Sequence, residues 1–214
     1  MSNMQLLTDY MINLEEKAAL DEVKRLLASG EKARDILDAL TAGMNVIGEK
    51  YAAGEYFLAE LVMGAEIFKE AMELLEPAML AQGAPERKVC GKMVIGTVQG
   101  DLHDIGKNIF VALARNAGFA VTDLGIDVPP AKFVEQVQKD GADILGMSGI
   151  MTMSLDPMAK TVKLLQEAGL RDKVKVIIGG LPVDERWRQL VGADAASDDA
   201  YKGLKIIQAF MGVK

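Results

Sequence analysis

The segment GDLHDIG, residues 100–106, combines residue types that could bind a metal ion or hold a proton. It contains His103, the one histidine of the chain, two residues after Asp101. A carboxylate at this spacing can accept a hydrogen bond from one ring nitrogen, which leaves the other nitrogen for a ligand. One imidazole cannot by itself form a metal site or a catalytic triad. A structural interpretation is also open, because an aspartate before a helix, such as Asp101 or Asp104, is usually an N-cap.

Two later segments carry unusual residues at the ends of apolar runs. SGIMTMS, residues 148–154, places the hydroxyls of Ser148, Thr152 and Ser154 among apolar neighbours. Gly179 and Gly180 follow another apolar run. A glycine pair usually forms a turn, but it also lets another group approach the backbone closely.

The C-terminal part of the chain must position all three segments. Short apolar runs at 92–98, 120–126, 142–148 and 174–180 alternate with helical segments, and GADAAS with a terminal helix follows. This alternation predicts an α/β flavodoxin-like (Rossmann-like) domain with a five-stranded parallel sheet in the order 2-1-3-4-5. Ligands bind at the carboxyl ends of such strands, so the loops after strands 1, 3 and 4 should converge on one edge.

The N-terminal part has a helical period instead. Apolar residues from Leu58 to Leu75 recur at steps of three and four, and three earlier segments, around 4–16, 17–28 and 35–51, complete an expected all-α four-helix bundle. Gly30, Gly54 and Pro77 are expected between or after the helices. A polar linker at 81–88 follows, and we predict two domains, 1–86 and 87–214.

Composition excludes several classes of protein. A net charge of −7 argues against nucleic-acid or anionic-membrane partners. The single cysteine, Cys90, excludes a disulfide framework or a zinc cluster, and no secretion signal or transmembrane run is evident. We therefore expect a cytoplasmic protein.

The spacing of the three segments resembles a known family. D-x-H-x-x-G at residues 101–106 is followed after 41 residues by Ser148-Gly149-Ile150, and after 28 more by Gly179-Gly180. This pattern resembles the cobalamin-binding domains of methionine synthase and of the small corrinoid proteins of methyltransferase systems. The helical segment GEYFLAELVMGAEIFKEAM, residues 54–72, also resembles that family. Ile150 stands where the family has leucine, a residue of similar volume.

The resemblance implies a role for each segment. His103 would be the lower axial ligand of the corrinoid cobalt, Asp101 would hydrogen-bond its ring, and Ser154 would continue this relay towards solvent. The relay of these three residues would take up a proton as the ligand leaves the cobalt. Phe57 and Val62 would cap the upper face of the corrin, unless they belong to the core of the bundle. The remaining cofactor-binding residues implied are Gly106, Ser148, Gly149, Ile150, Thr152, Gly179 and Gly180.

The same resemblance implies a methyl carrier that cycles between cob(I)amide and methylcob(III)amide. A substrate methyltransferase would supply the methyl group from methanol, a methylated amine, a betaine or an aryl methyl ether. An acceptor methyltransferase would pass it to tetrahydrofolate or a thiol, and a reductive activator would maintain the cofactor.

Three alternatives stay open at this point. A B12-dependent mutase subunit shares the histidine pattern but is not expected to carry the helical bundle. A corrinoid-responsive regulator would need a basic DNA-reading segment, and this acidic chain shows none. A receiver-like phosphorylation domain would need an aspartate after strand 3, where the chain has SGIMTMS.

Overall fold

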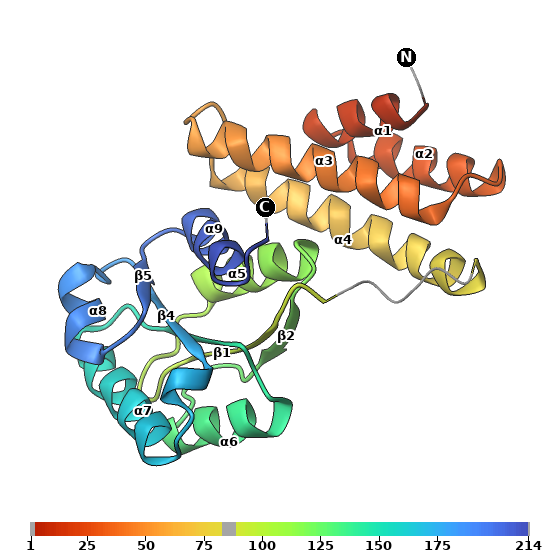
Figure 1. The fold of residues 1–214 in the computed structure, drawn as a ribbon. Helices are drawn as coiled ribbons and strands as arrows, with labels where there is room; N and C mark the ends of the chain where they lie inside the picture. The colour runs from red at the N-terminus through yellow and green to blue at the C-terminus, as the bar shows by residue number, and fades with distance from the viewer. Residues whose placement is uncertain (1–2, 83–88, 214) are drawn as a thin grey trace. The chain divides into compact units, whose positions relative to one another are not determined.

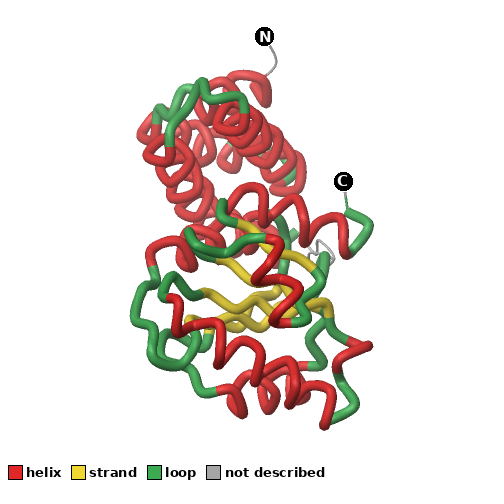
Figure 2. The backbone as a smooth tube through the Cα atoms, turned by 90° about the vertical axis from the view of Figure 1, so that its left-hand side faces the viewer, coloured by secondary structure: helices red, strands yellow, loops and turns green. Residues whose placement is uncertain are grey.

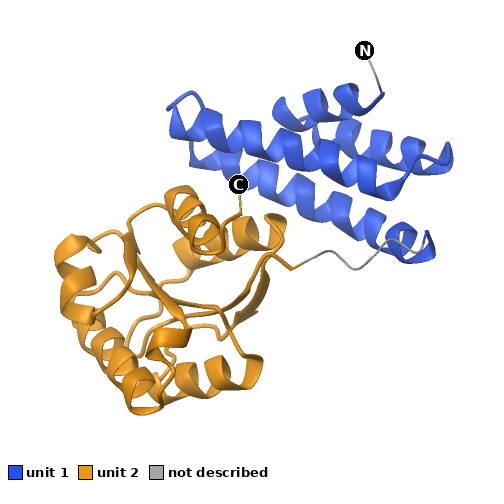
Figure 3. Ribbon diagram, viewed as in Figure 1, with its two compact units in different colours: residues 1–88 blue, residues 89–214 orange. Residues whose placement is uncertain are grey.

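The computed structural model describes residues 3–82 and 89–213. The chain divides into two compact units, residues 1–88 and 89–214 (Figure 3). The expected domain boundary between residues 86 and 87 lies among residues 83–88, outside the described residues. No helix in the described part of the chain is both long enough and apolar enough to cross a membrane.

Unit 1 consists of helices that pack side by side (Figure 1), and most of their buried residues are apolar. Helix α3 packs against both α1 and α4, and α2 packs against α4. Gly30 and Gly54 have positive φ angles of 85° and 76° in the turns after α2 and α3, as their role between helices requires. The helices are α1 (Asn3–Ile12), α2 (Glu16–Ala28), α3 (Ala33–Ala52) and α4 (Leu58–Ala81).

Two expectations about these helices are wrong. The first helical segment was expected around residues 4–16, but helix α1 ends at Ile12. The chain turns there, and Leu14 has a positive φ of 60°. Pro77 lies inside α4 instead of ending it. A proline lacks its own N–H bond to the preceding turn, and its ring crowds the carbonyl four residues earlier, but the N–H groups of the residues after it can still bond backwards. Helix α4 therefore continues past Pro77 to Ala81, and the N–H of Gln82 still donates to Ala78 O.

Unit 2 is a five-stranded parallel sheet with strand order β2-β1-β3-β4-β5, which confirms the predicted topology. Helices α5 and α9 pack together on one face of the sheet, and α6, α7 and α8 lie on the other (Figure 1). Figure 2 shows the strands enclosed between these helical layers. The strands are β1 (Lys92–Thr97), β2 (Ala120–Asp123), β3 (Ile144–Ser148), β4 (Lys175–Gly179) and β5 (Ala195–Ser197). The helices are α5 (Ile105–Asn116), α6 (Pro130–Asp140), α7 (Leu155–Glu167), α8 (Glu185–Val191) and α9 (Ala200–Phe210), with short 3-10 turns η1 (Thr152–Ser154) and η2 (Arg171–Lys173).

The core of unit 2 explains why its strands read as continuous apolar runs. Five of the six β1 residues and the middle of β3 and β4 are buried, as expected for a sheet covered on both faces. Strand β2 ends at Asp123, earlier than the apolar run, because Gly125 takes a positive φ of 84° and donates its N–H to the Asp123 carboxylate. Residues 124–126 therefore belong to the loop at the carboxyl edge of the sheet.

Candidate corrinoid-binding site

His103 lies in the turn between β1 and α5, with its side chain 57% exposed. Its ring Nδ1 is 2.7 Å from Asp101 Oδ1, and its backbone N–H donates to the same oxygen at 3.0 Å. An ionised carboxylate only accepts hydrogen bonds, so the proton of the neutral ring lies on Nδ1 and the lone pair on Nε2. Among the described residues, Nε2 has no hydrogen-bond partner. The ring therefore presents an outward nitrogen that is free to bind a ligand.

Asp101 joins this turn to the loop after β3, although it is fully buried. Its Oδ2 accepts hydrogen bonds from Ser154 Oγ at 2.8 Å, from the N–H of Ile150 at 2.8 Å and from that of Met151 at 3.3 Å. Burial alone would raise the pKa of Asp101. The hydrogen bonds from His103, Ile150 and Ser154 outweigh it, and the pKa is held well below its usual range. Asp101 is thus an anion at neutral pH and accepts hydrogen bonds from five donors.

The predicted hydrogen bonds that link His103, Asp101 and Ser154 are present, but this relay does not reach solvent at Ser154. Ser154 is fully buried, and its hydroxyl makes no hydrogen bond to a described residue other than the one to Asp101. The reason is close packing, because a Cβ on Gly149 would lie 2.5 Å from the Cβ of Ser154. Ser154 therefore holds Asp101 in place from beneath the loop.

The loops after β1, β3 and β4 lie side by side at the carboxyl edge, as their order in the sheet requires. The N–H of Val98 donates to Ser148 O at 3.0 Å, and the N–H of Gly149 donates to Gly179 O at 3.0 Å. The hydroxyls of Ser148 and Thr152 make no hydrogen bond within the described residues. The structure thus brings both residues to this edge but does not tie them to Asp101.

The four glycines predicted to bind the cofactor differ in whether the fold itself needs a glycine at that position. A Cβ on Gly180, whose φ is 141°, would lie 2.1 Å from Gly149 O, so Gly180 and Gly149 are needed for the packing of the protein itself. A Cβ on Gly179 would make only an ordinary 3.5 Å contact, with Ser197 O. A Cβ on Gly106, in the first turn of α5, would meet no atom within 4 Å. Space at Gly106 and Gly179 is therefore not used by the protein.

Six large apolar side chains in the segments that follow these strands are exposed, and they are not among the residues that the sequence predicted for the site. Large apolar residues are rarely exposed in a cluster unless they contact a ligand or a partner. In the sequence, the apolar residues within GDLHDIG and IMTM, and the one after Gly180, could have indicated these exposed side chains. These residues follow β1, β2, β3 and β4, and they are Leu102 (65% exposed), Ile105 (75%), Ile126 (44%), Met151 (37%), Met153 (61%) and Leu181 (82%).

These features fit a corrinoid. The corrin ring brings four equatorial nitrogens to cobalt, so one further nitrogen from the protein suffices, and no cluster of three or more metal-ligating side chains occurs in the described residues. The exposed apolar side chains suit the rim of a large macrocycle, and the space at Gly106 lies three residues after His103, in the first turn of α5. The donor set and its surroundings are therefore adequate for this cofactor.

Phe57 and Val62 belong to unit 1. Phe57 is the N-cap residue of α4 and is 73% exposed, while Val62 is half-buried in the first turns of that helix. The N–H of Phe57 donates to the Glu60 carboxylate at 2.9 Å, which fixes the start of the helix. Their contact with the cofactor stays a prediction.

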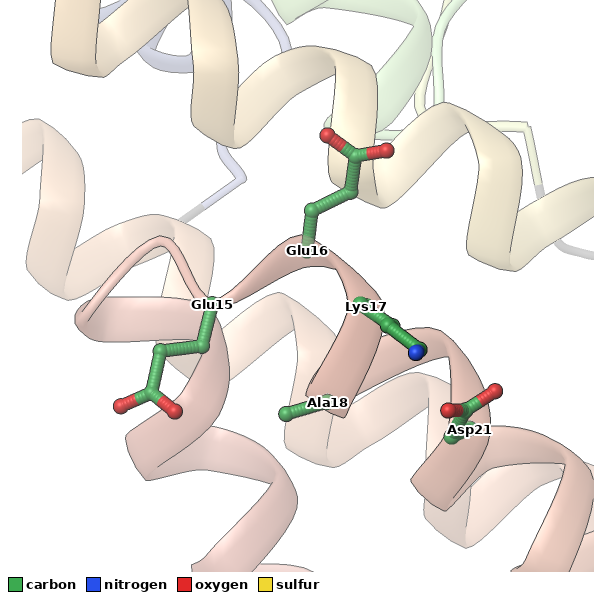
Figure 4. Close-up of a pocket in the computed structure, with 5 residues that line it drawn as sticks. All are labelled: Glu15, Glu16, Lys17, Ala18 and Asp21. Atoms are coloured by element: carbon green, nitrogen blue, oxygen red, sulfur yellow. The ribbon is translucent and has the colours of Figure 1, made fainter.

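A surface hollow of about 510 Å³ also lies in unit 1, at the start of α2. It is lined by Glu15, Glu16, Lys17, Ala18 and Asp21 (Figure 4). The three carboxylates point in different directions, so they do not form a cation site (Figure 4).

Comparison with known proteins gives matches over both units. One model of the family "B12 binding domain" matches residues 91–205, and a second model with the same description matches residues 4–76. Dimethylamine corrinoid protein 2 of Methanosarcina mazei is 39% identical over 197 residues, 92% of this chain and 91% of that protein.

Two solved structures are similar over nearly the whole chain. A cobalamin-binding protein from Desulfitobacterium hafniense is 42% identical, with a TM-score of 0.79 over 97% of this chain and 98% of that one. A chain of the methanol:cobalamin methyltransferase complex from Methanosarcina barkeri is 28% identical, with a TM-score of 0.85 over 99% of this chain and 80% of that one.

Proposed function

The chain belongs to the family of B12-binding corrinoid proteins, and from this premise we propose that it carries a methyl group between two methyltransferases. It binds cobalamin or a related corrinoid, whose cobalt supplies the methyl-accepting and methyl-donating chemistry when it is bound. The residues of the chain bind, orient and shield that centre. The observation that supports the proposal most is the outward Nε2 of His103, at a sheet edge rich in exposed apolar residues.

We assign the cobalt-binding nitrogen to Nε2 of His103. Asp101 keeps the proton on Nδ1, so Nε2 stays available as a ligand. Ser154 and the backbone N–H of Ile150 hold the carboxylate in place.

The other cofactor-binding residues are proposed with different roles. Gly106 and Gly179 offer space that no described residue occupies. Gly149 and Gly180 allow the two loops to pack, which brings Ile150 and Ser154 to Asp101. The remaining proposed contacts are Ser148 and Thr152 at the sheet edge and Phe57 and Val62 in unit 1.

The methyl donor and the partners are proposed from the relatives. One relative is a dimethylamine corrinoid protein, and one similar chain belongs to a methanol:cobalamin methyltransferase complex. We propose that a substrate methyltransferase delivers the methyl group of a methylated amine, methanol, a betaine or an aryl methyl ether. A second methyltransferase then serves tetrahydrofolate or a thiol, and a reductive activator restores the cofactor.

Reconstitution of the full chain with cobalamin tests the proposal. Wild-type protein should bind about one cobalt per chain and show the absorption spectrum of histidine-coordinated cobalamin. His103→Ala should lose that spectrum, while Gln99→Ala, an exposed residue of the same turn, should retain it. An unchanged spectrum and affinity in His103→Ala would show that another group is the ligand.

Methyl transfer itself needs a second assay. The loaded protein is mixed with candidate substrate methyltransferases, each with its methyl donor, and demethylation of the donor is followed. Turnover with one pair identifies the donor. Carbon-skeleton rearrangement with a mutase partner, in place of demethylation, would identify the chain as a mutase subunit.

A further inference from the structure

The hydroxyl of Thr97 makes a contact that the proposed mechanism has not used. Thr97 is the last residue of β1 and is fully buried. Its Oγ1 donates a hydrogen bond to the backbone carbonyl of His103 at 3.0 Å. The backbone of Thr97 is committed elsewhere, because its N–H donates to Gly125 O and its carbonyl accepts from the N–H of Val128. Its side chain therefore links the sheet to the residue that presents the outward nitrogen.

His103 is consequently held on both sides of its Cα atom. On one side, Asp101 Oδ1 binds both the backbone N–H and the ring Nδ1. On the other side, Thr97 binds the carbonyl. Asp101 belongs to the same turn as His103, whereas Thr97 belongs to a central strand. Among the described residues, no other hydrogen bond joins His103 directly to a strand of the sheet.

We propose that Thr97 is a positioning residue, which sets how far the His103 ring reaches towards the cobalt. This inference rests on the proposed ligand role of His103. A metal–ligand bond tolerates displacements of only a few tenths of an ångström, so a ligand on a turn needs support from a rigid element. Strand β1 is that element, since it lies between β2 and β3 in the sheet.

Thr97→Val tests the proposal because it keeps the shape and the branched Cβ of the side chain but removes the hydroxyl. Loss of one hydrogen bond should weaken coordination of the His103 ring in the cobalamin-loaded protein about two-fold to ten-fold. The absorption spectrum measures this as the fraction of loaded protein with the ring bound. Cobalt per chain should stay at the wild-type value. Thr97→Ser, which retains the hydroxyl, should restore coordination to near the wild-type value.

The protein without cofactor supplies a second readout. The chain has one histidine, so the NMR signals of an imidazole ring belong to His103 without further assignment. Thr97→Val should shift or broaden these signals, and Thr97→Ser should not. If the valine variant does not fold, Thr97→Ala is compared with Thr97→Ser, since that pair differs by the same hydroxyl.

The outcomes separate this inference from the proposed function. If His103→Ala loses the coordinated spectrum while the valine and serine variants both match wild type, Thr97 has only a structural role and the inference is wrong. If His103→Ala itself keeps the wild-type spectrum, the ligand assignment fails first. Reduced coordination in the valine variant with recovery in the serine variant supports the inference.

Discussion

Asp101→Asn should destabilise unit 2 even without cofactor, because an amide cannot replace this carboxylate. The two oxygens of Asp101 accept from five donors, and an asparagine side chain offers one oxygen and one NH₂ group. If the NH₂ faces the loop after β3, the N–H groups of Ile150 and Met151 lose their acceptor. If it faces His103, the backbone N–H of His103 loses its acceptor and the ring must move its proton to Nε2.

The size of this effect follows from the number of donors left without an acceptor. A hydrogen bond to a charged group contributes about 1.5–3 kcal/mol, and an unsatisfied buried donor costs about 1–3 kcal/mol. Because the loops can relax in part, we expect the free energy of unfolding of unit 2 to fall by about 2–4 kcal/mol. With a slope of about 2 kcal/mol per molar urea, the unfolding midpoint falls by roughly 1–2 M.

Urea unfolding and amide hydrogen exchange measure the two parts of this prediction. In the Asn variant, the amides of Ile150 and Met151 should exchange faster than in wild type. Asp104→Asn is the matched control, because Asp104 is only partly buried and its contact with the Asn108 amide can be kept by an asparagine oxygen. An unchanged midpoint together with unchanged exchange at Ile150 in Asp101→Asn would refute the reasoning.

The effect of Asp101→Asn on stability should also depend on pH in a defined direction. The pKa of Asp101 is lowered in the folded protein, so its stabilisation is complete above the unfolded-state value of about 3.9. It is lost as the pH falls through the lower pKa of the folded state. The stability gap between wild type and Asp101→Asn should therefore be full at neutral pH and shrink below about pH 4. A gap that is constant with pH would mean that the charge is not involved.

Three further outcomes are expected. Lys107, whose side chain is 2% exposed, pairs with Asp123, and Lys107→Met should lower the free energy of unfolding by about 3 kcal/mol, measured by urea unfolding. A double-mutant cycle with Asp123→Asn that shows no coupling would contradict this. Gly180→Ala should lower the thermal midpoint of the cofactor-free protein, because its Cβ would overlap Gly149 O, and an unchanged midpoint would contradict the close packing. Gly106→Ala should leave that midpoint unchanged or slightly higher yet weaken cobalamin binding, measured by titration, and equal affinity would show that the space at Gly106 is not used by the cofactor.

Much of the fold was predictable because its signals are local. Runs of apolar residues alternating with helical periods required a parallel sheet, and the observed strand order is the predicted one. The proximity of Asp101 to His103 followed from a separation of two residues within one turn. Pro77 misled the prediction, because a proline disturbs the turn that precedes it without preventing the residues that follow from continuing the helix to Ala81.

The site as a whole needed the tertiary structure. The amino-acid sequence determined that a single imidazole stands beside a carboxylate at the end of a strand, since both lie in one short segment. Only the folded chain decided which donors, 49 to 53 residues further on, hold that carboxylate, and that Thr97 holds the carbonyl of His103. The folded chain also distinguishes Gly180 from Gly106. The protein needs Gly180 for its own packing, whereas Gly106 leaves space that no described residue fills. Hydrogen bonds and steric contacts between distant residues depend on three-dimensional distance, and a local pattern of residue types carries no record of that distance.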